Sequence, residues 1–281
     1  MQTPPDLFDR GLLSMRRVRA AGFGAEGEFL HVEIADQVSE RLQEVNKSFQ
    51  SAAIIGPKAE LWVEALGNPA FRAYVDGEVL DLQESSLDLV VHGLALHWAN
   101  DPVGQLVQMR RALKPDGLMI AAMFGGQTLN ELRTALAEAE TEFEGGLSPR
   151  IAPMGEIRDL GGLIQRAGLA LPVADSVNLT VTYETPLHLM QDLRAMGETN
   201  VMHARRKTPM RRKTLMRAMD IYTEYFAEPD GRVPATFEIV FLTGWAPSET
   251  QQKSLRPGSA KARLADALQV PERSAGDKAK N

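Results

Sequence analysis

The 281-residue sequence has no cysteine, which excludes disulfide bonds and thiolate metal sites. Histidine is also scarce, and its five positions show no metal-ligand spacing such as H-x-x-x-H. The sequence contains neither a P-loop nor the nucleophile elbow of serine hydrolases. We therefore expect no metal site.

Long hydrophobic runs and an excess of positive charge are missing as well. No apolar run approaches the length that crosses a membrane, which is about 20 residues. The formal charge of −6 argues against general nucleic-acid binding. With 44% apolar residues, the chain is long enough to bury a full α/β core as one domain with insertions.

One basic stretch interrupts this acidic background. Residues 205–217 contain seven Arg or Lys residues and no acidic residue. Either these side chains form a solvated loop and helix surface, or they dock an acidic protein partner by steering and rim contacts. RNA is a weaker match, because aromatic residues that would stack on bases do not interleave with the basic ones.

Residues 85–124 have the pattern of a strand–helix–strand unit. Leu87–Val91 is a short apolar run that suits a buried strand, and Leu118–Phe124 is a second one. Between them, Pro102 opens a segment with apolar residues at helical spacing, and Lys114–Gly117 ends it. The two strands should be parallel with a right-handed crossover, so ligands would bind beyond their carboxyl ends.

The rest of the chain adds further predicted elements. Thr128 and Glu131 form a T-x-x-E capping box at the start of a helix. The other expectations are helices over Glu156–Ala167, from Thr185 and Pro186 to Gly197, and from Thr208-Pro209, with strands over Leu179–Tyr183 and Phe237–Trp245. The predicted domains are an N-terminal helical segment at 1–50, a core at 51–248 with a helical insertion at about 185–228, and a disordered tail at 249–281.

Several blocks of sequence resemble a known family. The LKPDG turn before an apolar strand, with DLVV before a loop containing HW, resembles the second half of class I S-adenosylmethionine-dependent methyltransferases. A narrower pattern resembles one branch, the assembly factors of respiratory complex I, which are methyltransferase-like proteins implicated in hydroxylating an arginine of a complex I subunit. The blocks that carry it are FDR at Phe8–Arg10, LHWANDP at Leu96–Pro102, AMFGGQTLNELR at Ala122–Arg133, AETEFEGGLSPRI at Ala139–Ile151, MGETN at Met196–Asn200 and DGRVPATFEI at Asp230–Ile239. The malonyl-carrier-protein methyltransferases of biotin synthesis are a more distant resemblance.

The resemblance implies a reduced, doubly wound Rossmann-like α/β fold. It has a mostly parallel sheet with a C-terminal antiparallel strand and a helical lid over the donor cleft. The implied function is a methyltransferase-like role in assembling complex I or modifying one of its subunits. The alternative is an active S-adenosylmethionine-dependent methyltransferase on a small-molecule or carrier-bound acid. Arginine hydroxylation would need an oxidant, and the sequence contains no His/carboxylate triad for iron and no flavin motif.

The segment that would bind the methyl donor departs from the family pattern. The family has a glycine-rich turn after its first strand, because the donor lies against backbone where a Cβ would collide. Gly56 keeps the first glycine, whereas Lys58 and Glu60 stand at the second and third positions. Ile54 replaces the usual acid, and Pro57 removes a backbone N–H donor. We therefore expect S-adenosylmethionine binding to be weak or lost.

Asp76 is the best remaining contact for the methyl donor. The segment around it can be aligned with the family pattern in two registers, and both lead to this conclusion. About thirty residues separate Gly56 from Leu87, too few for all the elements that the family has there. In one register, Val75–Leu82 follows the third strand and the ribose-binding strand is missing. In the other, Asp76 is the ribose acid at the end of strand Phe71–Val75 and the third strand is lost.

The candidate site residues fall into two sets. Those expected to bind the donor are Gly56, Asp76, His92 and Gly93, and the catalytic candidates expected in the cleft are His97, Trp98, Glu198 and Asn200. Each has an ordinary structural alternative, such as a tight turn, an Asp-Gly turn, a packed loop or a helix cap. The sequence leaves these alternatives open.

The N-terminus has a basic character that is typical of a transit peptide, with Arg16, Arg17 and Arg19. Asp6 and Asp9 interrupt it, and the family-like FDR block begins at once, which leaves no room for a removable leader. A cytoplasmic bacterial protein is therefore the expectation.

Overall fold

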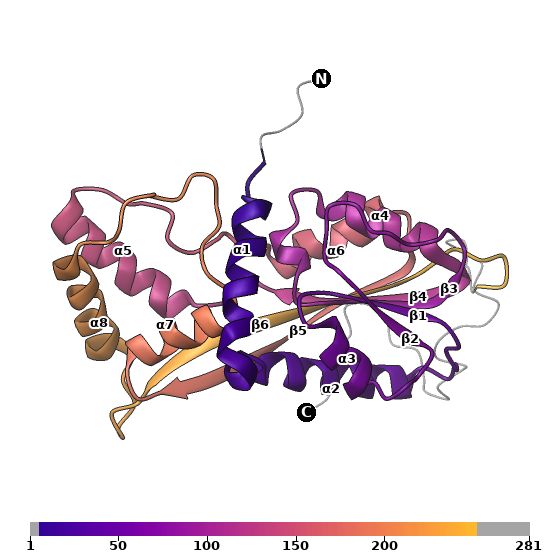
Figure 1. The fold of residues 1–281 in the computed structure, drawn as a ribbon, viewed down its shortest axis with the longest axis horizontal. Coiled ribbons are helices and arrows are strands. Elements are labelled where there is room, and N and C mark those ends of the chain that lie inside the picture. The colour runs from indigo at the N-terminus through magenta and orange to yellow at the C-terminus, as the bar shows by residue number, and fades with distance from the viewer. Residues whose placement is uncertain (1–5, 252–281) are drawn as a thin grey trace, which may run out of the picture. The chain divides into compact units, whose positions relative to one another are not determined.

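The computed structural model describes residues 6–251. They form eight α-helices, two 3-10 helices and six β-strands (Figure 1). The helices are α1 (Arg10–Ala20), η1 (Ala21–Gly27), α2 (Phe29–Glu44), α3 (Ala59–Ala65), η2 (Leu96–Trp98), α4 (Pro102–Ala112), α5 (Asn130–Glu144), α6 (Ile157–Arg166), α7 (Pro186–Ala195) and α8 (Arg212–Phe226). The strands are β1 (Ala52–Ile55), β2 (Phe71–Tyr74), β3 (Leu87–Gly93), β4 (Leu113–Phe124), β5 (Ala170–Tyr183) and β6 (Val233–Trp245). The tail expected at 249–281 lies, from residue 252 onward, outside the described residues.

The strands of the described chain form one sheet in the order β2-β1-β3-β4-β6-β5. β1 pairs in parallel with β2 and β3, and β3 with β4, whereas β6 is antiparallel to both β4 and β5. This topology confirms the predicted fold class. The classic doubly wound order places a third strand outside the second. Within residues 6–251, β2 is the edge strand, so the third strand of that order is missing.

Helices cover both faces of the sheet (Figure 1). On one face, α4 buries Leu106 and Met109 and α6 buries Leu160 and Ile164, at the spacing of amphipathic helices. α2 and α3 cover the other face, where the Trp62 ring is fully buried. β3 lies between the two layers and is buried almost throughout, which explains its continuous apolar sequence.

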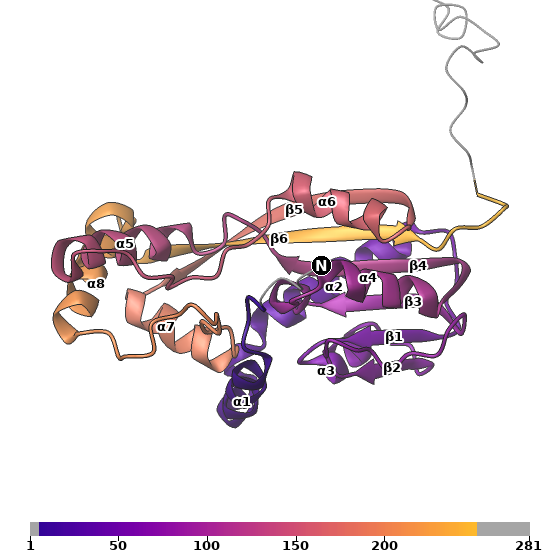
Figure 2. The same ribbon diagram turned by 90° about the horizontal axis from the view of Figure 1, so that it is seen from above.

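α7 and α8 form the predicted helical insertion between β5 and β6, and we call them the lid helices. β5 and β6 run past the end of β4 toward α5, α7 and α8 (Figure 2). Thr185 caps α7 by accepting a hydrogen bond from the His188 N–H, and Pro186 occupies the first turn, as the sequence predicts. Gly197 follows the end of α7 in a left-handed conformation, with a φ of 78°.

The predicted capping box at the start of α5 is wrong. Leu129, not Thr128, directly precedes the helix, and it has a left-handed φ of 57°. The Thr128 hydroxyl instead accepts a hydrogen bond from the Glu238 N–H, and the Glu131 carboxylate accepts from the Thr236 N–H and hydroxyl. Bonding to β6 therefore takes both side chains away from the helix terminus.

Four predicted starting points are also wrong. β4 begins at Leu113 rather than Leu118, and β6 begins at Val233 rather than Phe237. β5 begins at Ala170 rather than Leu179, because antiparallel pairing with β6 extends along the whole strand although most of its side chains are not buried. α8 begins at Arg212 rather than at Thr208-Pro209. Residues 206–211 form a non-helical connection instead.

Gly27 determines how closely η1 approaches the lid helix α7. A Cβ built at Gly27 would lie 2.3 Å from the Ala195 backbone oxygen, so alanine would push the two segments apart. We expect Gly27→Ala to lower the free energy of unfolding by about 1–3 kcal/mol. Gly22→Ala is the matched control, because nothing lies within 4 Å of a Cβ there, and it should change that free energy by less than about 0.5 kcal/mol. Urea unfolding measures both, and equal effects would contradict this packing.

Candidate functional site

The carboxyl ends of β1, β2 and β3 bring the four predicted donor-binding residues together. Parallel pairing of these strands aligns their ends at one edge of the sheet. Gly56 follows β1, Asp76 follows β2, and His92 and Gly93 end β3. Residues from three separate sequence segments therefore meet where doubly wound sheets bind ligands.

Close packing within the chain accounts for both glycines. A Cβ at Gly56 would lie 2.5 Å from the Gly93 carbonyl oxygen, and a Cβ at Gly93 would lie 2.7 Å from the Trp62 ring. The Trp62 indole N–H donates to His31 Nδ1 at 3.0 Å, which fixes the ring in place. A side chain of α3 therefore covers the backbone surface that glycine leaves open at the end of β3.

Asp76 is held by two arginines of α1. Its Oδ2 accepts from Arg17 Nη1 at 2.6 Å and from Arg10 Nη2 at 3.0 Å, and only 1% of its side chain is exposed. Burial would raise the pKa of the Asp76 carboxyl, but His92, Arg17 and Arg10 outweigh burial and lower the pKa below its ordinary value. Asp76 is therefore ionised at neutral pH and paired within the chain.

The strand order agrees with one of the two registers in which the segment around Asp76 can be aligned with the family pattern: the one that makes Asp76 the ribose acid after the second strand. Asp76 follows β2, and β2 pairs in parallel with β1, as the second strand of a doubly wound sheet does. The register in which this strand is missing does not fit. The strand absent from residues 6–251 is the third. Contact of Asp76 with a ribose stays a prediction.

His92 lies beside Asp76 in the interior. Its Nε2 is 3.1 Å from Gln105 Oε1 and 3.9 Å from Asp76 Oδ1, and its side chain is fully buried. Burial lowers the pKa of His92 to about 4, so the ring is neutral at pH 7. Because Gln105 Nε2 donates to the Gly77 carbonyl, Gln105 Oε1 is the acceptor for His92, and we assign the ring proton to Nε2.

Several buried polar atoms of this cluster lack partners. Within residues 6–251, Asp76 Oδ1, His92 Nδ1, and Arg17 Nε and Nη2 form no hydrogen bond. Asp76 and Arg17 also line a cavity of about 510 Å³ beneath α1, together with residues from segments 56–60 and 73–78. Buried polar groups are normally satisfied by protein, water or a ligand. These atoms are shielded from solvent, so a ligand in the cavity could reach them only if the cluster rearranged.

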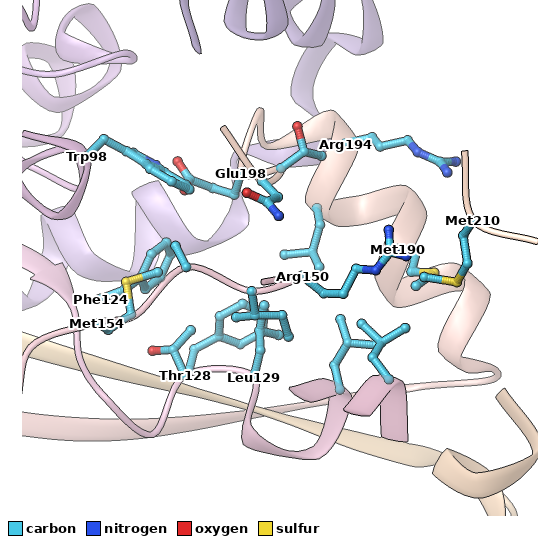
Figure 3. A pocket seen from close by; sticks show the side chains of 18 residues that line it. Trp98, Phe124, Thr128, Leu129, Arg150, Met154, Met190, Arg194, Glu198 and Met210 are labelled. Atoms are coloured by element: carbon cyan, nitrogen blue, oxygen red, sulfur yellow. The ribbon is translucent and has the colours of Figure 1, made fainter. Parts of the chain in front are cut away.

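A second cavity, of about 220 Å³, lies between α5 and α7 (Figure 3). Trp98, Glu198 and Asn200 from the predicted cleft set line it. Its walls are otherwise mostly apolar. Leucine side chains from the start of α5 and side chains of α7 form two of them, and three further segments each contribute one residue. These residues are Leu129, Leu132 and Leu136; Met190 and Leu193; and Phe124, Met154 and Met210. Figure 3 shows Glu198 beside the Trp98 ring at one end of this cavity.

Glu198 brings negative charge to the second cavity. Its Oε2 accepts from Trp98 Nε1 at 2.7 Å and lies 3.1 Å from His97 Nε2, and 6% of its side chain is exposed. Burial would raise the pKa of the Glu198 carboxyl, but His97, Arg17 and the Trp98 N–H lower it below its ordinary value. The cavity therefore presents an ionised carboxylate in largely apolar surroundings.

The other cleft candidates have structural partners. The His97 ring packs on Phe124, with ring centres 4.8 Å apart, and does not itself line the cavity. Asn200 Nδ2 donates to the Pro149 carbonyl at 2.7 Å, which ties the segment after α7 to the one after α5. His97 and Trp98 position Glu198, whereas Asn200 orders the cavity wall.

Sequence reasoning missed Arg10 and Arg17 as site residues. Arg10 belongs to the FDR block that carries the family resemblance, so that block is the signal that could have identified it. Arg17 lies 59 positions from Asp76 in the sequence, and no local pattern links the two residues.

The basic stretch at 205–217 is largely paired within the chain. Its arginines form ion pairs mainly with acidic residues of α5: Arg205 with Asp9, Arg206 and Arg211 with Glu144, and Arg217 with Glu142 and Glu224. Lys213 lies over the Phe143 ring, 3.9 Å from its centre. These contacts favour the surface interpretation over docking of an acidic partner.

The described chain offers neither a metal centre nor a membrane-spanning helix. Among residues 6–251, no group of three His, Asp or Glu side chains is arranged to hold a metal ion. In the same part of the chain, no helix combines the length and the apolar character needed to cross a bilayer.

Comparison with known proteins first defines the class. Residues 27–121 match the family described as the methyltransferase domain. Together with the doubly wound sheet, this match makes the chain a protein of the methyltransferase fold.

Relatives that align along most of the chain define the branch. The mitochondrial arginine-hydroxylase NDUFAF5 of Danio rerio is 34% identical over 94% of this chain and 90% of the relative, and that of Homo sapiens is 36% identical over 91% and 81%. The chain belongs to the NDUFAF5 family. The malonyl-[acyl-carrier protein] O-methyltransferase of Halorhodospira halophila is 35% identical over 64% of this chain and 59% of that protein. Both resemblances seen in the sequence are confirmed.

The buried Asp76 pair should make stability depend on acid pH. Because the folded state lowers the pKa of Asp76, its stabilisation is complete above the ordinary value of 3.8 and is lost as the pH falls below it, through the folded pKa. We expect Asp76→Asn to lower the free energy of unfolding by about 3 kcal/mol at pH 7, because two partly buried arginines lose their partner. Urea unfolding between pH 7 and pH 3 should show a shallower decline for this variant than for the unchanged protein.

The exposed Asp36 of α2 supplies the control for this measurement. Asp36→Asn removes the same charge from the chain but leaves the Asp76 cluster intact. Its pH profile should follow that of the unchanged protein. An Asp76→Asn profile that also follows it would contradict the assigned role of the ion pair.

Proposed function

We propose that this protein acts in the assembly of respiratory complex I, or in the modification of one of its subunits, with a degenerate methyl-donor site. Its family supports the first part, because relatives aligned along most of its length are named arginine hydroxylases. The partner is a complex I subunit, by the sequence blocks that resemble the assembly-factor branch. S-adenosylmethionine binds weakly or not at all.

The pairing of Asp76 with Arg10 and Arg17 is the observation that carries the degenerate donor site. A ribose diol would have to donate to a carboxylate that already accepts from two guanidinium groups. Displacing those groups would leave two largely buried arginines without their partner, which is costly. A donor would therefore compete with α1 for the acid.

The turn after β1 supports the same proposal. Lys58 stands where the family has its second glycine, and its Nζ pairs with Glu28 at 2.7 Å. Trp62 occupies the space next to Gly93, which a Cβ would otherwise enter. Side chains of α3 and of its approach thus take the place of an open backbone surface.

We expect S-adenosylmethionine to bind the unchanged protein in the millimolar range or more weakly, a few kcal/mol short of a micromolar site. Replacing both arginines, Arg10→Gln with Arg17→Gln, should tighten binding about tenfold or more, because Asp76 becomes free to accept from a diol. Arg19→Gln, at an exposed position of the same helix, is the control and should have no effect. Calorimetric titration measures all three proteins. Micromolar affinity of the unchanged protein would overturn the degenerate site.

An active methyltransferase on a small-molecule or carrier-bound acid is the second candidate function. The observation that favours it is the set of buried Asp76 and Arg17 atoms without hydrogen-bond partners in residues 6–251, beside the cavity under α1. A bound polar ligand would satisfy them if the cluster opened, because in this structure they are shielded from solvent. Methyl transfer needs little acid–base help once nucleophile and methyl group are aligned, so it does not require a catalytic base. Micromolar donor affinity together with methyl transfer to such an acid would establish this function.

Deleting the gene from its host should lower the amount of assembled complex I and its NADH–quinone activity. Restoring the gene should restore both, which controls for effects on neighbouring genes. Mass spectrometry of complex I subunit arginines, with and without the gene, shows whether the role includes a modification. Normal NADH–quinone activity in the deletion strain would contradict the proposed role.

The cellular location is part of the proposal. The sequence favours the cytoplasm of a bacterium, whereas the named relatives are mitochondrial. In either setting, the proposed partner is a complex I subunit that this protein meets during assembly.

A further inference from the structure

We infer that two copies of this chain associate edge to edge through β5, which joins their sheets into one continuous sheet. This inference goes beyond the proposed function and does not depend on it. Three observations carry it: the length of the unpaired edge, the direction of its free backbone groups, and the match between β5 and an antiparallel copy of itself.

β5 is a long edge strand with little of the protection that edge strands usually have. Within residues 6–251 it ends the sheet order and pairs only with β6, and Figure 2 shows it at the opposite border of the sheet from β2. Lysines, prolines, bulges or short length commonly block such edges. β2 has only four residues, whereas β5 has fourteen and contains neither lysine nor arginine. Pro172 and a register shift between Ala170 and Val173 interrupt only its start.

The hydrogen bonds of β6 show which residues of β5 have free backbone groups. The Thr236 N–H donates to the Glu131 carboxylate, away from β5. The Glu238 carbonyl accepts from the Gly125 N–H, again away from β5. Bonding alternates along an antiparallel strand, so the odd-numbered residues of β6 bond to β5, and their partners there are also odd-numbered. The residues of β5 that direct N–H and C=O outward are therefore Ala174, Ser176, Asn178 and Thr180.

These outward-facing backbone groups are available for another strand. In the part of the chain that the structure describes, no element on the outer side of β5 forms a hydrogen bond with them. Ser176, Asn178 and Thr180 are exposed. The free stretch ends at Thr182, whose carbonyl accepts from Arg232 Nη2 at 2.6 Å. An unpaired row of this kind is a template for strand addition.

An antiparallel second copy satisfies this row completely. When Val177 lies opposite itself, the outward-facing residues meet one another in pairs, so every free N–H and C=O finds a partner. The pairs are Ala174 with Thr180 and Ser176 with Asn178. In the same alignment, Pro172, which has no N–H, lies opposite Thr182, whose carbonyl Arg232 already satisfies. This match is a property of the strand with itself, which favours a second copy over an unrelated strand.

The side chains of β5 match in the same alignment. The odd-numbered positions form a largely apolar row, which stays on one face of the joined sheet because odd positions meet odd positions. This row contains Val173, Val177, Leu179 and Val181, of which the last three are half-buried against the core and Val173 is 54% exposed. Asp175 lies opposite Leu179 of the other copy and is paired with Arg41 at 2.5 Å within its own chain. The two Asp175 charges therefore do not meet.

The contact area sets the expected strength of this dimer. Stable interfaces bury about 800 Å² per partner, and one edge strand supplies less than that. We therefore expect a reversible dimer with a Kd of about 10–100 μM. Sedimentation equilibrium of the full chain from about 5 to 500 μM should show the average mass rising from that of one chain toward twice that value. A single-chain mass throughout this range would overturn the inference.

The absence of cysteine makes a single introduced thiol a direct probe of the contact. In the proposed alignment, the two Val177 residues form a non-hydrogen-bonded pair, with Cα atoms about 4.5 Å apart and within reach of a disulfide. Oxidised glutathione should therefore convert Val177→Cys into a covalent dimer on non-reducing gels. Failure of this variant to cross-link at about 200 μM would overturn the β5 contact.

Val173→Cys is the matched control for the alignment. It lies on the same face of the same strand and is exposed, but it lies opposite Val181 of the other copy. Two such thiols would be about 27 Å apart, so this variant alone should not cross-link. Mixed with Val181→Cys, it should give a covalent dimer that contains one copy of each variant. Cross-linking of Val173→Cys alone, as readily as Val177→Cys, would overturn the alignment.

Lysines on the edge should separate the two copies. Ser176→Lys with Asn178→Lys places like charges directly opposite each other across the contact, at exposed positions that the fold tolerates. The Kd should rise about tenfold or more. Thr134→Lys with Thr141→Lys adds the same charge at exposed positions of α5 and should leave the Kd unchanged. Equal Kd values for the two lysine variants would overturn association through β5.

Discussion

The Asp76–arginine cluster holds α1 across the carboxyl edge of the sheet, and the arrangement of both cavities depends on it. Asp76 is fixed at the end of β2, and its partners Arg10 and Arg17 lie two helical turns apart on one face of α1. α1 consequently lies between the β1–β2 edge and the lid helix α7 in both views (Figures 1 and 2). One buried carboxylate thus determines the position of a helix that belongs to neither layer on the sheet.

From α1, the same constraint extends to the second cavity. Arg16 donates from Nη1 to Thr199 Oγ1 at 2.7 Å and to the Asn200 carbonyl at 2.6 Å. Both residues directly follow Glu198, so the backbone that carries the Glu198 carboxylate is tied to the same helix as Asp76. Phe8, just before α1, packs edge-on against Trp98 with ring centres 5.1 Å apart. Asp76 and the backbone that follows Glu198 are therefore both anchored to α1.

Elements with a local physical cause could be predicted from the sequence. The β3–α4–β4 unit follows from apolar runs and a Pro/Gly turn, and the start of α7 follows from Thr185 and Pro186. Features decided by distant partners could not be predicted. Thr128 and Glu131 match a capping box locally, yet β6 takes both side chains. The site candidates came from family position together with local placement at strand and helix ends. Neither source identifies the partners of these residues, because the partners lie far away in the sequence.

The proposed degenerate donor site would make Asp76 a residue whose role has changed from binding a ligand to holding a helix, with the fold retained. An acid at the end of the second strand is suited to accept two hydrogen bonds from a ribose diol, and it accepts two equally well from guanidinium groups. In this structure Arg10 and Arg17 supply such donors, so the acid stabilises the N-terminal helix. The remaining Arg17 and Asp76 atoms without partners in residues 6–251 are shielded from solvent, although both residues line the cavity under α1. A ligand that needs the Asp76 carboxylate must therefore displace Arg10 or Arg17, so that such a ligand and α1 compete for the same acid.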